Sequence, residues 1–220
     1  MPTENIEKSY EKSYQTLKAR YSSEELLRQA ARRRCHLNYQ RISFGRLNGQ
    51  KNYLRTLLPQ AHAAYYLGSF HACISLCGSM LEALLQMFLR GELKREGIIS
   101  FGFYYQGSKI EKVTTQEELE KMSFNDMINF CKQKKILSEE LFRDLCFIKD
   151  IRNRTLHERI PRFRETEGRF VLTLRKGNYI SRVSLETQEV GELRENGYQI
   201  TAYYCLSRMR RIFAHLLAGS

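Results

Sequence analysis

The chain has 220 residues, of which 42% are hydrophobic and 27% are charged, and its formal net charge is +12. This length suits one domain with an extension, and the hydrophobic share is enough for a buried core. The most apolar stretch, from Phe70 to Leu89, is interrupted by polar side chains, so we expect no membrane span. The N-terminus lacks the apolar segment of a signal peptide, and the cysteines lack close metal-ligand spacing. We therefore expect a cytoplasmic protein with reduced thiols, no metal and no cofactor.

The first part of the sequence is basic and helical. From Lys18 to Arg55 it has ten Lys and Arg residues against two carboxylates, which gives a net charge of +8. Ser22 and Glu25 have the spacing of a capping box, and the glycines between residues 42 and 50 predict a loop. We place a domain boundary at this loop, so that residues 1–48 form a basic N-terminal helical extension and residues 49–220 form the main domain.

A basic stripe of this kind attracts polyanions, although many such runs are solvated faces. We favour nucleic acid over an acidic membrane surface, because the segment has no broad apolar face. The arginines to which we assign RNA contacts here are Arg28, Arg32, Arg33 and Arg34.

Two helices are predicted next, over residues 51–67 and 70–90. Pro59 predicts a kink or restart in the first of them, Gly68 ends it, and Ser69 caps the second. The second helix is apolar over most of its circumference, which predicts a central position. Its one polar line contains Glu82, which either faces water or contacts the later helix that carries Arg152. The small residues Gly78 and Ser79 would let two helices approach closely there.

The middle of the chain is less regular. Residues 97–114 combine three glycines with Phe101, Phe103, Tyr104 and Tyr105, and we expect an irregular loop whose aromatic rings pack over a core edge or stack on bases. Ser123 is predicted to cap a short helix to about Lys135. A further helix is expected to begin after Ser138 and to end before Pro161.

Beyond residue 161 the pattern changes. Alternating apolar residues over about 168–186 predict a β-hairpin insertion, and a last helix is expected over about 200–217. The sequence thus predicts a mainly α protein, an antiparallel helical bundle with an N-terminal helical extension and a small β-hairpin insertion before the last helix.

The helix that begins after Ser138 carries the most informative motif. Its apolar stripe of Leu141, Leu145 and Ile148 continues in steps of three and four to Arg152, where the pattern calls for a leucine, and then to Leu156. A charge on a core-facing stripe needs a partner, and Glu82 is the best-placed carboxylate.

Arg152, Asn153 and His157 provide a cation, a hydrogen-bonding group and a proton shuttle within six positions. Asn153 and His157 share one face of the helix, whereas Arg152 and His157 lie about 140° apart. These are groups that cleavage of a phosphodiester without metal requires.

This motif resembles the R-x4-6-H signature of the HEPN domain family (higher eukaryotes and prokaryotes nucleotide-binding). A second stretch, Ala61 to Leu93, is similar to the helical hairpin that precedes the signature in that family. The resemblance implies a metal-independent endoribonuclease that acts as a homodimer through the helix of residues 152–157. It also implies RNA ends of the 2′,3′-cyclic phosphate and 5′-OH type, and a role in antiviral defence, a toxin–antitoxin pair or RNA processing.

In the roles that the resemblance implies, Arg152 stabilises the transition state, Asn153 positions the phosphate or the histidine, and His157 transfers a proton. Arg154 and Arg159 are assigned to RNA contacts, and an antitoxin or defence-complex protein is an expected partner. One toxin branch has a tyrosine two positions after the histidine, where this chain has Arg159, so regulation by modification of that tyrosine is not expected. The main alternative is a non-catalytic HEPN module that binds RNA, a nucleotide or a protein; a transcriptional regulator is a weaker one.

Overall fold

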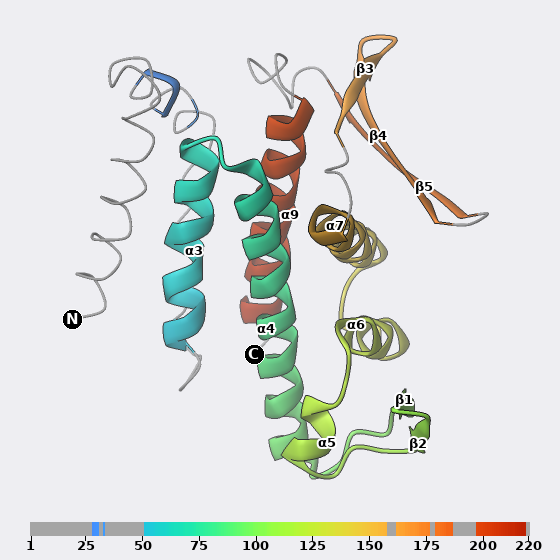
Figure 1. The fold of residues 1–220 in the computed structure, drawn as a ribbon. Helices are drawn as coiled ribbons and strands as arrows, with labels where there is room; N and C mark the ends of the chain where they lie inside the picture. The colour runs from blue at the N-terminus through green and yellow to red at the C-terminus, as the bar shows by residue number, and fades with distance from the viewer. Residues whose placement is uncertain are drawn as a thin grey trace.

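A computed structural model of the chain describes residues 28–30, 33, 51–157, 162–176, 179–186 and 197–218. This part of the protein is mainly α-helical, as predicted, and also contains two small antiparallel sheets (Figure 1). Most of the predicted N-terminal extension, including its helices and the loop at the domain boundary, lies outside the described residues.

The helices are α3 (Lys51–Tyr66), α4 (Phe70–Glu96), α5 (Gln116–Glu120), α6 (Phe124–Gln133), α7 (Glu139–His157) and α9 (Gly197–Ala218). One sheet pairs β1 (Phe103–Tyr105) with β2 (Ser108–Ile110), and the other has the order β3 (Arg164–Thr166), β4 (Arg169–Lys176) and β5 (Tyr179–Glu186).

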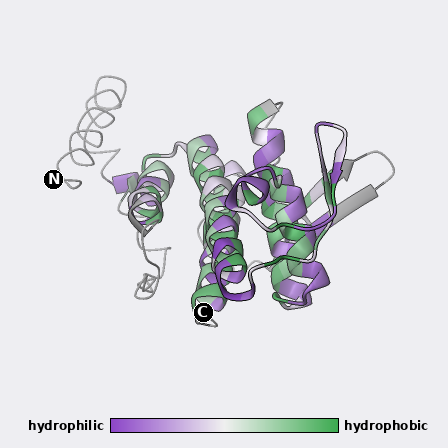
Figure 2. Cartoon of the chain, turned by 90° about the horizontal axis from the view of Figure 1, so that it is seen from below, coloured by the Kyte–Doolittle hydropathy of each residue, from purple (hydrophilic) through white to green (hydrophobic). Residues whose placement is uncertain are grey.

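Helix α4 is the centre of the structure. It packs against α3, α7 and α9, and its buried side chains belong to one hydrophobic cluster with residues of those helices. Figure 2 shows hydrophobic residues on the facing sides of the helices and hydrophilic residues toward the outside. By length and composition α4 could also cross a membrane, but half of its most apolar stretch is buried within this structure. Its apolar circumference therefore serves contacts with three neighbouring helices.

The ends of α3 and α4 are only partly as predicted. Helix α3 continues as one helix through Pro59, and Gly68, with φ of 77°, adopts the left-handed conformation that ends it. Ser69 precedes α4, but its side chain makes no capping hydrogen bond. Helix α4 also continues past the predicted end, to Glu96, where Gly97 takes the left-handed position that commonly ends helices.

The four long helices do not all alternate in direction. Helices α3 and α4 are antiparallel neighbours, whereas α9 runs in the same direction as α4 (Figure 1). Near the start of α9, the ring centre of Tyr203 lies 6.4 Å from that of Tyr65, which is beside the start of α4. Near the end of α9, His215 lines a cavity together with residues from the end of α4. Helix α7 is seen nearly end-on in Figure 1 and so crosses these helices. A simple antiparallel bundle therefore describes only the first pair.

Short helices α5 and α6 begin with capping boxes. The Ser123 side chain accepts from Asp126 N while the Asp126 carboxylate accepts from Ser123 N, as expected for the predicted cap, and Thr115 and Glu118 do the same for α5. These reciprocal bonds satisfy backbone donors at each helix start.

The region of residues 97–114 is more regular than predicted. It forms the β1–β2 hairpin, whose turn uses Gln106 and Gly107 at φ of 49° and 81°. Phe103 is buried and Phe101 packs edge-on against Phe130, which confirms the packing over a core edge, while Tyr104 is 71% exposed and its stacking on bases stays a prediction. The hairpin was missed because three-residue strands give too short an alternation to detect.

The predicted hairpin near residues 168–186 is present and has a third strand. Strands β4 and β5 pair from Arg169–Glu186 to Lys176–Tyr179, and β3 adds to the other edge of β4. Phe170, Leu172 and Leu174 are buried, while Thr173 is exposed, as the alternation predicted. The turn between β3 and β4 is a two-residue turn with positive φ, typical of tight hairpins.

One buried histidine makes stability depend on pH. His62 of α3 is only 4% exposed, and its pKa is lowered from 6.5 to about 4, first by burial and then by the charge of Arg210. The folded state therefore favours the neutral imidazole. Its contribution to stability is fully present above pH 6.5 and is lost as the pH falls toward 4, because the unfolded chain takes up the proton first.

We predict that His62→Gln flattens the pH dependence of the free energy of unfolding between pH 7 and pH 4. Relative to this variant, the wild type should lose on the order of 3 kcal/mol across that interval, from the size of the shift. Urea unfolding at a series of pH values measures the difference. His71→Gln is the control, because His71 is exposed on α4. Equal pH slopes in the wild type and His62→Gln would contradict the prediction.

Candidate functional site

Arg152 stands where the buried stripe of α7 reaches the surface. Leu145 and Ile148 of that stripe are fully buried, whereas the Arg152 side chain is 23% exposed and Leu156 is 53% exposed. The stripe does not continue into the core at Leu156, whereas Ile151 in the preceding turn is fully buried. Arg152 is therefore a boundary residue, with its stem against the protein and its head near solvent.

The stem of Arg152 occupies the space that Gly78 leaves on α4. A Cβ atom at position 78 would lie 2.5 Å from Cγ of Arg152 and 2.9 Å from its Cβ. These atoms are close to the α7 backbone and have little freedom to move away. The absence of a side chain at Gly78 is thus what allows the arginine to cross α4, which agrees with the close helix approach predicted at Gly78 and Ser79.

The head of Arg152 reaches Glu82, one turn further along α4. Its Nη2 donates to Glu82 Oε2 at 3.3 Å, so the prediction that the Arg152 helix packs beside the Glu82 helix is confirmed. Glu82 itself is 30% exposed and lines a small cavity of about 300 Å³ together with Tyr53, Ser79, Ala83, Gln86 and Met87.

The pairing of Arg152 is loose. Charge-assisted hydrogen bonds are normally about 2.7–2.9 Å long, and Arg211 meets Glu140 at 2.8 Å, but Arg152 meets Glu82 at 3.3 Å and Asn153 Oδ1 at 3.4 Å. Nε of Arg152 is buried and has no hydrogen-bond partner among the described residues. A buried donor without an acceptor costs about 1–3 kcal/mol. Stability alone does not explain an arginine here.

The other motif residues lie on the last turns of α7. Asn153 is exposed and His157 is the final residue of the helix, one turn further on; the His157 side chain lies outside the described residues. Arg154 is partly exposed, but it lies about 200° around the helix from Arg152. Arg152 and Arg154 therefore do not converge on one point.

Helix α7 is joined to α9 by a partly buried polar cluster that the sequence pattern did not predict. Asp144, 8% exposed, accepts a hydrogen bond of 2.8 Å from the hydroxyl of Tyr204. Arg211 lies between Asp144, at 3.7 Å, and Glu140. Burial raises the pKa of Asp144, and the Tyr204 hydrogen bond and Arg211 lower it in part; burial and the neighbouring carboxylate raise the pKa of Tyr204.

A signal for this cluster was available, because Asp144 lies three residues after Leu141 and four before Ile148 and so falls on the apolar stripe. It interrupts the stripe as Arg152 does. The cluster holds α7 at a defined rotation about its axis, and Arg152 depends on that rotation to reach Gly78.

Two of the four N-terminal arginines assigned to RNA are described. Arg28 is exposed, whereas Arg33 is partly buried, donates to the Tyr66 backbone oxygen at 2.8 Å and lies over the Phe70 ring at 5.4 Å. Its guanidinium thus contacts the turn between α3 and α4, which gives it a packing role. Arg32, Arg34 and Arg159 lie outside the described residues, and the RNA contacts assigned to all of these arginines stay predictions.

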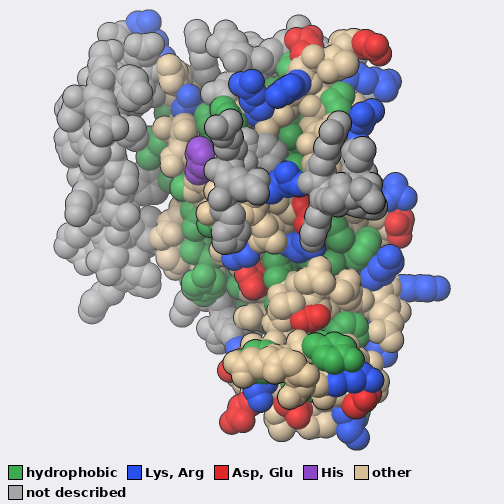
Figure 3. All heavy atoms as spheres, turned by 45° about the vertical axis from the view of Figure 1, so that its right-hand side comes forward, with side chains coloured by type: hydrophobic (Ala, Val, Ile, Leu, Met, Phe, Trp, Pro, Cys, Tyr) green, Lys and Arg blue, Asp and Glu red, His purple; other side chains and the backbone are tan. Residues whose placement is uncertain are grey.

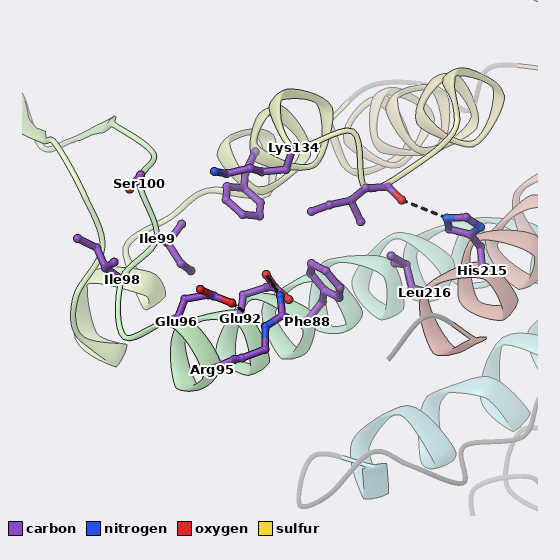
Figure 4. Close-up of a pocket in the computed structure, with 12 residues that line it drawn as sticks. Phe88, Glu92, Arg95, Glu96, Ile98, Ile99, Ser100, Lys134, His215 and Leu216 are labelled. Atoms are coloured by element: carbon purple, nitrogen blue, oxygen red, sulfur yellow. Dashed lines mark hydrogen bonds and ion pairs between the residues drawn. The ribbon is translucent and has the colours of Figure 1, made fainter.

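A larger cavity, of about 600 Å³, lies at the other end of α4 and does not include the motif (Figure 4). Phe88, Ile99 and Phe130 contribute to its lining, and His215 Nε2 is 3.1 Å from Ile136 O at its edge. Glu92 and Glu96 at the cavity are both paired with Arg95, at 2.8 and 2.9 Å. Lys134 also lines the cavity, so the lining carries two carboxylates and two cations and has no excess charge of either sign.

No family model matches the chain, and neither a curated protein nor a solved structure is similar to it at a significant level. The resemblance to HEPN domains therefore has no support from these comparisons.

We predict that Gly78→Ala destabilises the protein by about 1–3 kcal/mol, the usual cost of overpacking, because the new methyl group overlaps the Arg152 stem. Urea unfolding measures the change in the free energy of unfolding. Gly91→Ala is the matched control on the same helix: Gly91 is exposed and has open space around its missing Cβ. That control should stabilise by about 0.4–1 kcal/mol, and a similar gain for Gly78→Ala would contradict the packing described above.

Proposed function

We propose that the chain is a metal-independent endoribonuclease of the HEPN type, which acts as a homodimer and cleaves RNA to 2′,3′-cyclic phosphate and 5′-OH ends. The observation that carries the proposal is Arg152, a loosely paired guanidinium held at the protein surface by Gly78 and Glu82. Its position one residue before Asn153 and five before His157, at the end of α7, agrees with a site for a phosphodiester.

In this mechanism the ribose 2′-oxygen attacks phosphorus while the bond from phosphorus to the 5′-oxygen breaks. His157 accepts the proton of the 2′-OH or supplies one to the leaving 5′-oxygen. Arg152 stabilises the additional negative charge of the phosphorane-like transition state, and Asn153 positions the phosphate. Glu82 orients the Arg152 guanidinium, and the 3.3 Å separation leaves that guanidinium able to turn toward a phosphate.

A homodimer through α7 is supported by the exposed Leu156. This leucine is 53% exposed on the last turn of α7, beside the motif. In a two-fold interface the same surface patch of both protomers is used, so each residue in it is present twice. One exposed leucine therefore contributes two apolar side chains to the interface. Two α7 ends brought together in this way would place two copies of the motif around one RNA strand.

The setting that we propose is the cytoplasm, in antiviral defence, a toxin–antitoxin pair or RNA processing, with an antitoxin or defence-complex protein as a further partner. The antiparallel α3–α4 pair precedes the motif helix in the order that the family resemblance implies, and the later helix α9 completes the packing around α4.

The alternative is a non-catalytic HEPN module that binds RNA, a nucleotide or a protein. The specific observation in its favour is the Glu82–Arg152 pair, because a carboxylate beside the guanidinium reduces the positive charge offered to a phosphate. Cleavage assays separate the two functions.

We predict that the purified protein cleaves single-stranded RNA in EDTA, and that His157→Ala and Arg152→Ala each reduce the rate by about 10²-fold or more, as general acid–base and electrostatic contributions imply. Gel analysis of end-labelled RNA measures the rates and identifies the 2′,3′-cyclic phosphate. Arg143→Ala is the matched control, since Arg143 is 76% exposed on the first half of α7. Unchanged cleavage in both motif variants, or cleavage only with added Mg²⁺, would refute the nuclease.

We also predict that Leu156→Asp converts the dimer to a monomer, because it places a carboxylate in an apolar contact. Sedimentation velocity measures the mass, and circular dichroism confirms that the fold is retained. Ile98→Asp serves as the control, because Ile98 is 38% exposed near the other end of α4. A wild-type monomer, or a dimer that both variants leave unchanged, would exclude the α7 interface.

A further inference from the structure

The β3–β4–β5 sheet has one buried and one exposed face. Phe170, Leu172 and Leu185 are 1–3% exposed and belong to the hydrophobic cluster of the helices. Residues of opposite parity point away from that cluster, because side chains alternate along a strand. The register places the remaining positions in rows across the exposed face: Thr166 with Arg169 and Glu186, Arg164 with Val171 and Ser184, Thr173 with Arg182, and Arg175 with Ile180.

This exposed face is basic and polar. Arg164, Arg169 and Arg182 are all exposed, and Thr166, Thr173 and Ser184 between them are exposed hydroxyl residues. Same-face residues of a strand are about 7 Å apart and neighbouring strands about 5 Å apart, so the three arginine positions span on the order of 14 Å. In Figure 3, Lys and Arg side chains lie in the upper part of the view, at the level of the sheet in Figure 1, with some Asp and Glu side chains beside them.

The sheet is fixed next to the motif helix. Phe163, immediately before β3, lies 5.9 Å from the ring of Tyr204, and Phe147 of α7 lies 5.8 Å from the same ring. Phe163 N also donates to Gly197 O at the start of α9, where a side chain at Gly197 would overlap the Phe163 carbonyl oxygen. Tyr204 thus joins the base of the sheet to α7, and only six residues separate His157 from Arg164.

We propose that the exposed face of the β3–β4–β5 sheet, defined by Arg164, Arg169 and Arg182, binds the phosphate backbone of the RNA that the α7 site cleaves. This inference rests on the proposed function and adds to it the surface that holds the substrate. Guanidinium groups bind phosphate oxygens, and the hydroxyl side chains between them donate to phosphate and sugar.

RNA fits this face better than an anionic membrane does. The described exposed large hydrophobic residues are Tyr53, Ile98, Tyr104, Tyr105, Leu156 and Tyr198, and the sheet contains none of them. A membrane-binding surface combines basic residues with apolar ones that enter the lipid. The described exposed side chains of this face are those of arginine, threonine and serine, which instead match a hydrated polyanion.

The test uses the full chain and a short 2′-O-methyl oligoribonucleotide, which lacks the 2′-OH nucleophile and so reports binding without cleavage. Fluorescence anisotropy at several salt concentrations gives the dissociation constant and its salt dependence. For the triple variant Arg164→Gln, Arg169→Gln and Arg182→Gln, the slope of log K against log salt should fall by about 2, from three lost phosphate contacts at about 0.7 each. The Arg→Lys triple variant at the same positions should keep most of the slope, since charge is retained.

A matched control removes three exposed charges elsewhere, with Arg95→Gln, Lys109→Gln and Arg143→Gln. It should leave the slope nearly unchanged. Equal losses in the sheet variant and this control would assign binding to net charge and overturn the proposal. An unchanged slope in the sheet variant would overturn it as well. So would a sheet variant that loses binding to phosphatidylserine vesicles but keeps its binding to the oligoribonucleotide.

Cleavage assays keep this inference separate from the nuclease proposal. If the wild type cleaves RNA and the sheet variant has the same KM, the nuclease stands and the sheet surface is refuted. If the sheet variant loses binding while the wild type never cleaves, the surface stands and the nuclease fails. The expected result is a raised KM with little change in kcat, because the sheet contacts RNA away from the reacting atoms.

Discussion

The passage of the Arg152 stem across Gly78 is the contact on which the site depends. An arginine on a buried stripe requires space for its methylenes, an acceptor for its guanidinium and an exit toward solvent. Helix α4 supplies the first two, with a residue that has no side chain at position 78 and a carboxylate one turn later at Glu82. The end of α7 supplies the third. A larger residue at position 78 would remove the arginine from this place.

The rotation of α7 is set by a second polar interruption of the same stripe. Asp144 is bonded to Tyr204 and lies near Arg208 and Arg211 of α9. Replacing one partner of a buried polar group leaves the other unsatisfied, so such clusters disfavour alternative packings more than they add stability. Tyr204 also contacts Phe163 at the base of the β3–β4–β5 sheet. A single tyrosine thus relates the motif helix, the last helix and the basic sheet face.

Positively charged side chains lie at the exposed end of α7 and on the sheet that follows it in the chain. Arg152 lies at the surface end of α7, and Arg164, Arg169 and Arg182 lie on the exposed face of the sheet that follows in the chain. Arg33 donates to the Tyr66 carbonyl oxygen and lies over the Phe70 ring. Basic residues are thus found both in packing contacts and on exposed surfaces of this protein.

The sequence by itself determined the helical class, the central place of α4, the span of α7 and which side chains of β4 are buried, and it offered Glu82 as the best-placed partner of Arg152. These follow from hydrophobic periodicity and from the cost of an unpaired charge, which act along a single element or between two. Only the tertiary structure decided that α9 runs parallel to α4, that residues 103–110 form a hairpin, that Leu156 is exposed and that Tyr204 joins Asp144 to Phe163. Those features depend on which surfaces meet in space, and helical or strand periodicity is the same whichever neighbour covers the apolar face.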